Sequence, residues 1–387
     1  MRFSEIIGQQ EIKNKLIQTV ADQRVSHAQM FFGPEGDEKL ALAIAYAQFI
    51  NCTGRGNRMD SCGTCPSCIQ FQKLAHPDLH FIYPVATTKK VSTKPRSVDF
   101  LTEWREFLLG NEYHVTLQEW YEHIGIENKQ GIISASDCNE IIHTLSYKSY
   151  ESEYKVMILW MAEKLFYSAA PKILKILEEP PEKTLFILIA EDPEQVIPTI
   201  RSRTLLVKIP KIDPEDIREH LKLKFRLGEK EAGILARQSG GNIKLAIHRM
   251  QQVEEEQFNF RTFREWMRFC FANDIAGLIG FSAEISRIGR EKQKSLLLYG
   301  LKTLQACNLL SLTGGEPVTR SEEEMTFIRK MSPFIHPSNL PSFAGLFETA
   351  LYHIERNAYS QLLFMDVSLQ CIRLFHEAGK PVKRTGR

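Results

Sequence analysis

The sequence predicts an α/β domain built on a parallel sheet, with a small metal-binding insertion, followed by a chain that is wholly helical. Three observations support this fold class. Apolar runs alternate with helical patterns over the first 210 residues, four cysteines gather within residues 52–68, and only helical patterns follow Pro210 and Pro214. Near-continuous apolar strands that alternate with helices are typical of a parallel sheet covered on both faces.

Five short apolar runs are predicted to be strands, namely residues 28–32, 79–83, 155–161, 184–190 and 204–209. One connecting helix is well marked. Pro171 suits its first turn, residues 173–177 supply an apolar face, and Pro180 with Pro181 ends it. We expect these elements to form one α/β domain over residues 1–210.

A long polar segment, residues 86–130, interrupts this alternation and reads as an insertion. Its first half is basic, and its second half carries the apolar residues Trp104, Phe107, Leu108, Leu117 and Trp120. We expect the second half to be helical. The pattern assigns the segment no role beyond a surface for a partner.

Two helical domains are predicted after the Pro-rich linker. Residues 211–255 read as a small domain of about three short helices, broken near Gly228 and at residues 239–242. Residues 256–387 read as a larger helical domain with a basic tail. Its aromatic stripe is typical of a helix-bundle core and comprises Phe258, Phe263, Trp266, Phe269 and Phe271.

The composition is that of an ordinary globular protein, because 43% of the 387 residues are hydrophobic and 25% are charged. A net charge of +2 does not favour a protein that binds nucleic acid alone through many phosphate contacts. The N-terminus lacks the apolar run of a signal peptide, and no stretch reaches the ~18 apolar residues of a membrane span. We expect a cytoplasmic protein that contacts no membrane.

Cys52, Cys62, Cys65 and Cys68 have the spacing C-x9-C-x2-C-x2-C, which favours a structural zinc site with four thiolate ligands. In a cytoplasmic protein a disulfide is disfavoured, and redox chemistry or unliganded thiols are the alternatives. Zinc knuckles also bind nucleic acid. The residues between these cysteines are mostly small or polar, so we interpret the zinc module, residues 50–70, as a structural link that holds an insertion to its domain.

Residues 33–40, GPEGDEKL, are close to a phosphate-binding loop, which reads GxxxxGK followed by Ser or Thr. Gly33 and Lys39 are in register, and Gly36 lies inside the loop. Glu38 replaces the second glycine, and Leu40 replaces the hydroxyl that holds Mg²⁺. A carboxylate ~4 Å from a phosphate charge is repelled by about 4 kcal/mol at an effective dielectric constant of 20.

The acidic residues that hold Mg²⁺ in such enzymes are missing as well. At the end of the strand 155–161 their places are taken by Trp160 and Met161, and the first carboxylate, Glu163, lies beyond the strand. We therefore predict a degenerate loop, kept for packing, at which ATP is not bound productively and no hydrolysis occurs.

Arg201 and Arg203 stand on a turn before the fifth strand. An arginine on a rigid turn can stabilise a transferring phosphate in a neighbouring subunit, because its planar charge matches phosphate oxygens. A surface ion pair explains the same residues. The local pattern by itself leaves both readings open.

Several stretches together resemble the clamp-loader branch of the AAA+ superfamily, and within it the delta-prime family of bacterial DNA polymerase III. They are residues 3–16, 26–36, 52–68, 76–82, 173–190, 199–204 and 239–247. The resemblance implies a subunit of a ring that uses ATP to load a sliding clamp on primed DNA during replication. The implied partners are the motor (tau/gamma) and delta subunits, the clamp and primed DNA.

The resemblance also implies roles for single residues. Arg203 matches an arginine finger that acts in trans, although Thr204 departs from the usual cysteine. The four clustered cysteines match a structural zinc site, and Lys244 replaces a nucleotide-sensing arginine. Residues 211–255 would be the lid and 256–387 the collar that holds the ring together. The chain would then belong to a DNA-directed DNA polymerase holoenzyme without ATPase or polymerase activity of its own.

Two other functions remain as alternatives. An autonomous AAA+ ATPase would bind and turn over Mg²⁺-ATP, against which Glu38, Leu40 and Trp160 argue. A zinc-dependent DNA-binding module would bind primed DNA alone with a steep salt dependence, against which the near-neutral charge argues.

Overall fold

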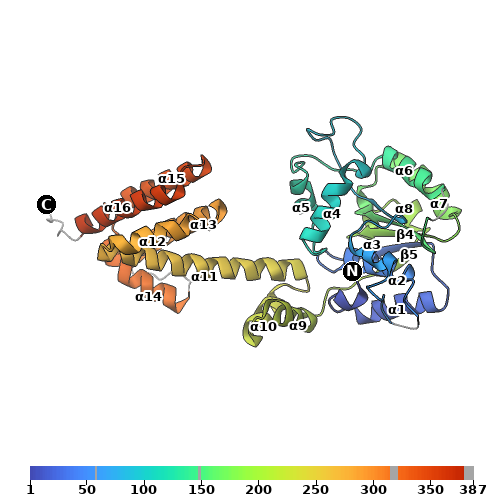
Figure 1. Cartoon of the computed structure of the whole chain (residues 1–387), viewed down its shortest axis with the longest axis horizontal. Coiled ribbons are helices and arrows are strands. Elements are labelled where there is room, and N and C mark those ends of the chain that lie inside the picture. Colours follow the sequence, from blue (N-terminus) through green and yellow to red (C-terminus); the bar gives the residue numbers. More distant parts are fainter. Residues whose placement is uncertain (57–58, 147–149, 314–320, 379–387) are drawn as a thin grey trace. The chain divides into compact units, whose positions relative to one another are not determined.

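The computed structural model describes residues 1–56, 59–146, 150–313 and 321–378 (Figure 1). The chain divides into two compact units, Met1–Arg249 and Met250–Arg387. The predicted division into three domains stays a prediction, since the short helices expected to form the lid fall within the first unit. Among the described residues, no helix combines the length and the apolar character that a membrane span requires.

The first unit contains a parallel five-stranded sheet in the order β2-β3-β4-β1-β5. The strands are β1 (Ala28–Phe32), β2 (Leu79–Ile82), β3 (Lys155–Trp160), β4 (Thr184–Ala190) and β5 (Leu205–Lys208). All five strand predictions are confirmed to within one residue at either end. The parallel sheet predicted from the alternation of apolar runs and helices is confirmed as well.

The period of two along each strand divides the side chains between two cores. Ile158 and Ile187 face a core shared with α2, whereas Met157 and Leu188 face the core under α6 and α7.

The α-helices of the first unit are α1 (Gln10–Ala21), α2 (Lys39–Ile50), α3 (Pro66–Gln72), α4 (Leu101–Gly110), α5 (Leu117–His123), α6 (Ala135–Ser146), α7 (Ala170–Glu178), α8 (Pro198–Arg201), α9 (Pro214–Phe225) and α10 (Glu229–Gln238).

The insertion is helical in its second half, as predicted, and it forms α4 and α5. Its aromatic residues do not face outward as a partner surface would require. Trp104 and Trp120 are fully buried, and their rings meet edge to face with centroids 5.0 Å apart. Both belong to the core under α2, so the insertion is part of the α/β domain.

The domain boundary predicted between residues 255 and 256 falls within a helix. A single 30-residue helix, α11 (Ile243–Ala272), runs through it. Residues 251–258, QQVEEEQF, contain neither proline nor glycine, and glutamine and glutamate are good helix formers. The break at residues 239–242 is present, because Gly240 and Gly241 adopt positive φ between α10 and α11.

The second unit is helical, as predicted. Besides most of α11 it contains α12 (Ile275–Ile285), α13 (Arg290–Thr313), α14 (Glu322–Met331), α15 (Leu340–Glu355) and α16 (Ser360–Ala378). Its core is built around Trp266, which stacks on Phe347 with ring centroids 5.5 Å apart.

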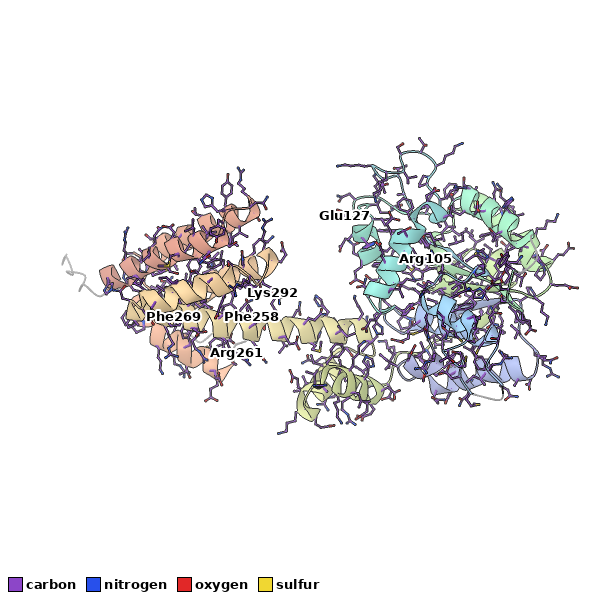
Figure 2. The ribbon with its side chains drawn as sticks, viewed as in Figure 1. Arg105, Glu127, Phe258, Arg261, Phe269 and Lys292 are labelled. Carbon is purple, nitrogen blue, oxygen red and sulfur yellow. The ribbon has the colours of Figure 1, made fainter. Side chains whose placement is uncertain are left out.

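The aromatic stripe of α11 is only partly core. Phe263 and Trp266 are buried, whereas Phe258 and Phe271 are 36% and 53% exposed. With 3.6 residues per turn, these two positions turn away from the face that carries Phe263. Phe258 lies near Lys292 of α13, whose ammonium is 5.9 Å from the ring centroid (Figure 2).

Candidate functional site

The loop between β1 and α2 keeps the backbone of a phosphate-binding loop although its sequence has changed. Glu38 has φ 71°, a left-handed conformation that favours glycine. A methyl group at Gly33 would collide with the carbonyl oxygen of Ile209, and one at Gly36 with the side chain of Asn242. The two glycines are therefore required by close packing, whether or not a ligand binds.

The anion position at the start of α2 is taken by a carboxylate of the loop itself. The Asp37 Oδ1 atom accepts hydrogen bonds from the backbone N–H and the ammonium of Lys39, both at 3.1 Å. The ammonium also donates to the Pro34 carbonyl oxygen at 2.8 Å. Burial raises the pKa of Asp37 to about 6, with Lys39 opposing the shift, so the carboxyl group is ionised at pH 7.

The insertion covers this loop. His114 Nδ1 lies 2.9 Å from Glu38 Oε1, and both side chains are almost fully buried. The Lys244 ammonium, at the start of α11, lies 2.8 Å from Glu119 Oε1 on α5. Two of the residues that depart from a nucleotide-binding pattern, Glu38 and Lys244, thus meet side chains of the insertion.

A third residue that departs from the nucleotide-binding pattern also contacts the insertion. Trp160, at the place of a missing acidic residue, packs on Trp104 of α4 with ring centroids 5.1 Å apart. Met161 follows in the same core, and Glu163 lies in the short helix after the strand, where it accepts a hydrogen bond from the backbone N–H of Glu191.

The cavity at the start of α2 has a volume of about 30 Å³, room for about one water molecule. It is far smaller than the roughly 300–1,000 Å³ of pockets that hold drug-sized ligands. A second cavity, of about 480 Å³, is lined by Pro34 and Glu35 of the loop together with Glu163, Glu191 and residues of the insertion. Side chains of the loop, the insertion and α11 line the smaller cavity, among them Glu35, Asp37, Glu38, Lys39, Leu40, Tyr113, His114, Val115, Glu191 and Lys244.

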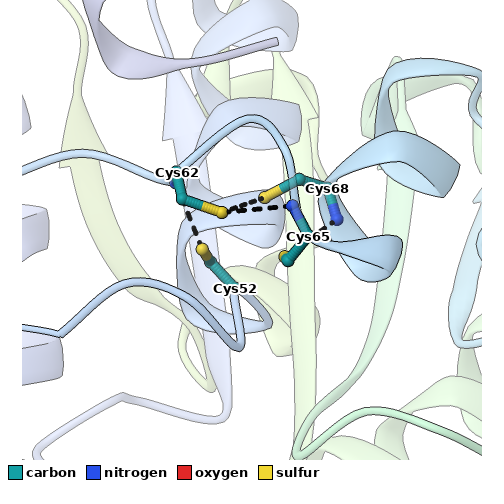
Figure 3. Close-up of side chains that lie close together, drawn as sticks. All are labelled: Cys52, Cys62, Cys65 and Cys68. Carbon is teal, nitrogen blue, oxygen red and sulfur yellow. Dashed lines mark hydrogen bonds between the residues drawn. The ribbon is translucent and has the colours of Figure 1, made fainter.

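The four clustered cysteines lie together before and at the start of α3 (Figure 3). Their sulfur atoms are all within 4.8 Å of one another, and Cys62 Sγ is 3.9 Å from Cys68 Sγ. Four sulfurs at ~2.3 Å from a tetrahedral zinc ion are about 3.8 Å apart. His76 and His80 are not in this group of candidate ligands, which among the described residues consists of the cysteines alone.

The backbone of the cysteine loop also favours thiolates. The N–H of Cys62 donates to Cys52 Sγ at 3.2 Å, and the N–H of Cys65 donates to Cys62 Sγ at 3.3 Å. Burial opposes ionisation of Cys65, but hydrogen bonds from Thr53 and Cys68 lower its pKa to about 5, whereas burial raises the pKa of Cys52 and of Cys68. A deprotonated thiol is the form that binds metal, so these residues fit zinc.

Arg203 lies on the turn between α8 and β5 and is half-exposed. Its Nε donates to Glu178 Oε1 at 2.6 Å, and Nη1 donates to the Thr199 carbonyl oxygen at 3.0 Å. Arg201, the last residue of α8, pairs with Glu194 in the short helix that precedes α8. Leu205 and Leu206, which follow on β5, are 52% and 47% exposed.

Sequence reasoning missed Asp37, His114 and Glu119 as part of this site. The departures at Glu38 and Lys244 were visible, but their partners lie some 75 to 125 positions away along the chain. A buried glutamate needs a hydrogen-bonding or charged partner. The insertion was the one polar segment to which the sequence assigned no role, so it was the place to look for that partner.

The fold is an α/β domain with a parallel sheet, in which the first strand leads into a loop close in sequence to a phosphate-binding loop. A family model described as DNA polymerase III, delta subunit matches residues 8–213, which is more than half of the chain. The chain therefore belongs to this family.

The relatives include two kinds of DNA polymerase III subunit. A gamma/tau subunit of Mycobacterium bovis is 29% identical over 52% of this chain and 27% of its own length. The delta' subunit of Bacillus subtilis is 26% identical over 55% of this chain and 51% of its own. The chain thus spans about a quarter to a half of these relatives.

A solved structure of a gamma subunit-related protein from Thermotoga maritima aligns with 94% of this chain and 99% of its own, with 13% identity and a TM-score of 0.38.

Proposed function

We propose that the chain is the non-hydrolysing, delta-prime type of subunit in a DNA polymerase III clamp loader. In this role it assembles in the cytoplasm with tau/gamma and delta subunits and takes part in ATP-driven loading of the sliding clamp on primed DNA. The observation that carries the proposal is the lining of the loop: the cavity at the start of α2 is about 30 Å³ and is lined by several carboxylates.

This observation favours the delta-prime kind of relative over the motor kind. A motor subunit needs a site that admits Mg²⁺-ATP, and here Leu40 and Trp160 stand where a hydroxyl and a carboxylate would hold the metal. The same residues argue against an autonomous ATPase. The zinc module has a structural role in this proposal, since four thiolates leave no open coordination position.

Arg203 is the chain's contribution to ATP hydrolysis in this proposal. It reaches the ATP of an adjacent motor subunit and stabilises the charge of the transferring phosphate. Glu178 holds the guanidinium on the rigid turn before the subunits meet, at a half-exposed position where the ion pair is weak. The exposed Leu205 and Leu206 then lie at the subunit contact.

The test is the DNA-stimulated ATPase of a reconstituted ring that contains Arg203→Ala. Loss of a finger lowers turnover at the adjoining site by roughly 10³-fold, so the ring loses the share of its ATPase that this site supplies. Arg201→Ala, two residues away, is the matched control and should keep full activity. Unchanged ATPase and clamp loading with Arg203→Ala would exclude the finger.

A further inference from the structure

Several residues of this chain depart from a nucleotide-binding pattern, and each of them contacts a side chain of the insertion. Glu38 meets His114, Trp160 meets Trp104, and Lys244 meets Glu119. Leu40 lines the small cavity together with Tyr113 and Val115 of the same segment. Each of these four altered positions therefore has a neighbour in the insertion.

The two lysines suited to phosphate both have carboxylate partners from this chain. Lys39 contacts Asp37 at 3.1 Å, with side chains 8% and 1% exposed. Lys244 contacts Glu119 at 2.8 Å. Glu35 and Glu191 add further negative charge at the cavity wall, and burial raises the pKa of each. A polyphosphate would therefore have to displace internal anions and enter a negatively charged cavity.

The insertion also reaches the helices that follow the sheet. Glu112 forms an ion pair with Lys224 of α9, and the ring of His114 packs edge to face on His220 of α9 with centroids 6.4 Å apart. Lys244 begins α11, next to Ile243, whose backbone N–H donates to the Gly36 carbonyl oxygen at 3.3 Å. One short segment thus contacts the loop, α9 and the start of α11.

We propose that residues 111–119, together with the Asp37 carboxylate, are a built-in occupant of the nucleotide site. This occupant takes the place of the bound nucleotide: it fills the volume, supplies the anions for Lys39 and Lys244, and fastens α9 and the first turn of α11 to the loop. The site is then held in one closed form whatever the ATP concentration. The proposal does not depend on Arg203 and is tested on the isolated chain.

The first experiment measures equilibrium binding of labelled Mg²⁺-ATP to four forms of the full chain. They are the wild type, a restored loop (Glu38→Gly with Leu40→Thr), a chain in which a Gly/Ser linker of equal length replaces residues 111–119, and the combination of both. Glycine fits φ 71° at position 38, so the restored loop retains its backbone. We expect binding by the combination and at least tenfold weaker binding by the restored loop alone.

Equal affinity of the restored loop with and without the segment would overturn the proposal, and so would no binding by a folded combination. In case the linker variant does not fold, the triple change Tyr113→Gly, His114→Ala and Glu119→Gln in the restored loop opens the same space with the chain length unchanged. Its binding is judged by the same comparison, and circular dichroism verifies its fold.

The second experiment measures amide hydrogen exchange in α9 and the first turn of α11. Removing the charges that fasten these segments, with Glu112→Gln and Glu119→Gln, should speed their exchange at least fivefold and leave β4 unchanged. Glu106→Gln is the matched control, because Glu106 is exposed on α4 of the same insertion. Unchanged exchange in the double variant, or equal acceleration by Glu106→Gln, would show that the segment does not fasten these helices.

Discussion

At the scale of single residues, a few side chains disfavour the binding of phosphate at this loop. Glu38 keeps the left-handed conformation of a glycine and lies against His114, and Asp37 gives Lys39 an internal counter-ion. Buried charges persist only when they are paired. The substitutions in the loop thus form one set with residues of the insertion.

Asp37 should make stability depend on pH in a predictable direction. Burial raises its folded pKa from 3.8 to about 6, so the folded chain binds this proton more tightly than the unfolded chain. The free energy of unfolding should therefore fall as pH rises from about 4 to about 6 and then stay level. The difference in pKa corresponds to roughly 3 kcal/mol.

Asp37→Asn removes this titration. Urea unfolding of both forms between pH 4 and 7 should show the wild type losing about 3 kcal/mol relative to the variant over that interval. Parallel curves for the two proteins would contradict the assignment.

Gly36→Ala should destabilise the first unit, because the added methyl group collides with Asn242 and the φ of 79° strains any other residue. We expect a loss of about 2 kcal/mol in thermal or urea unfolding. Gly110→Ala is the control, since a methyl group there meets nothing within 4 Å. An equal effect at both positions would mean that packing does not require Gly36.

At the scale of elements, the insertion and the cysteine module are stabilised in different ways. The helices α4 and α5 bury their tryptophans in the main core, whereas the cysteine module has little apolar surface of its own. Small loop-rich modules of this kind need a metal or a cross-link to stay folded. Zinc is therefore expected to contribute directly to stability.

Metal analysis of protein purified without chelator should give one zinc ion per chain. Zinc at 100 times its dissociation constant adds about 2.7 kcal/mol, so a strong chelator should lower the melting temperature by roughly 5–10 °C. Cys65→Ser should abolish stoichiometric zinc, and Cys270→Ala, outside the cluster, should keep it. Zinc-free native protein, or an unchanged melting temperature after all four cysteines become serine, would refute the site.

At the scale of the whole molecule, the chain has two units with separate cores, and α11 runs from one into the other. Trp104 is buried in the first core and Trp266 in the second. Replacing a buried tryptophan by alanine costs about 3–5 kcal/mol in the core that contained it.

Unfolding should therefore show two transitions that respond separately. Trp104→Ala should lower the first unit's transition and Trp266→Ala the second's, as followed by calorimetry. Each variant is the control for the other. A single transition that both changes shift equally would indicate one cooperative unit.

The sequence by itself determined the sheet, because short apolar runs separated by helical patterns have few alternatives to parallel pairing. It also determined the cysteine group, since metal-ligand spacing is local, and the departures at Glu38, Leu40 and Trp160. The sequence did not determine the domain boundary predicted at residue 255, because α11 continues where a helix could either break or extend. It did not determine the exposure of Phe258 and Phe271 either.

Only the tertiary structure decided what the altered loop meets. His114, Glu119 and Trp104 come from a segment far along the chain, and their contacts depend on how that segment packs on the sheet. The residue types at the loop show that a ligand is disfavoured there. Which groups take its place is fixed by long-range packing, for which local patterns carry no signal.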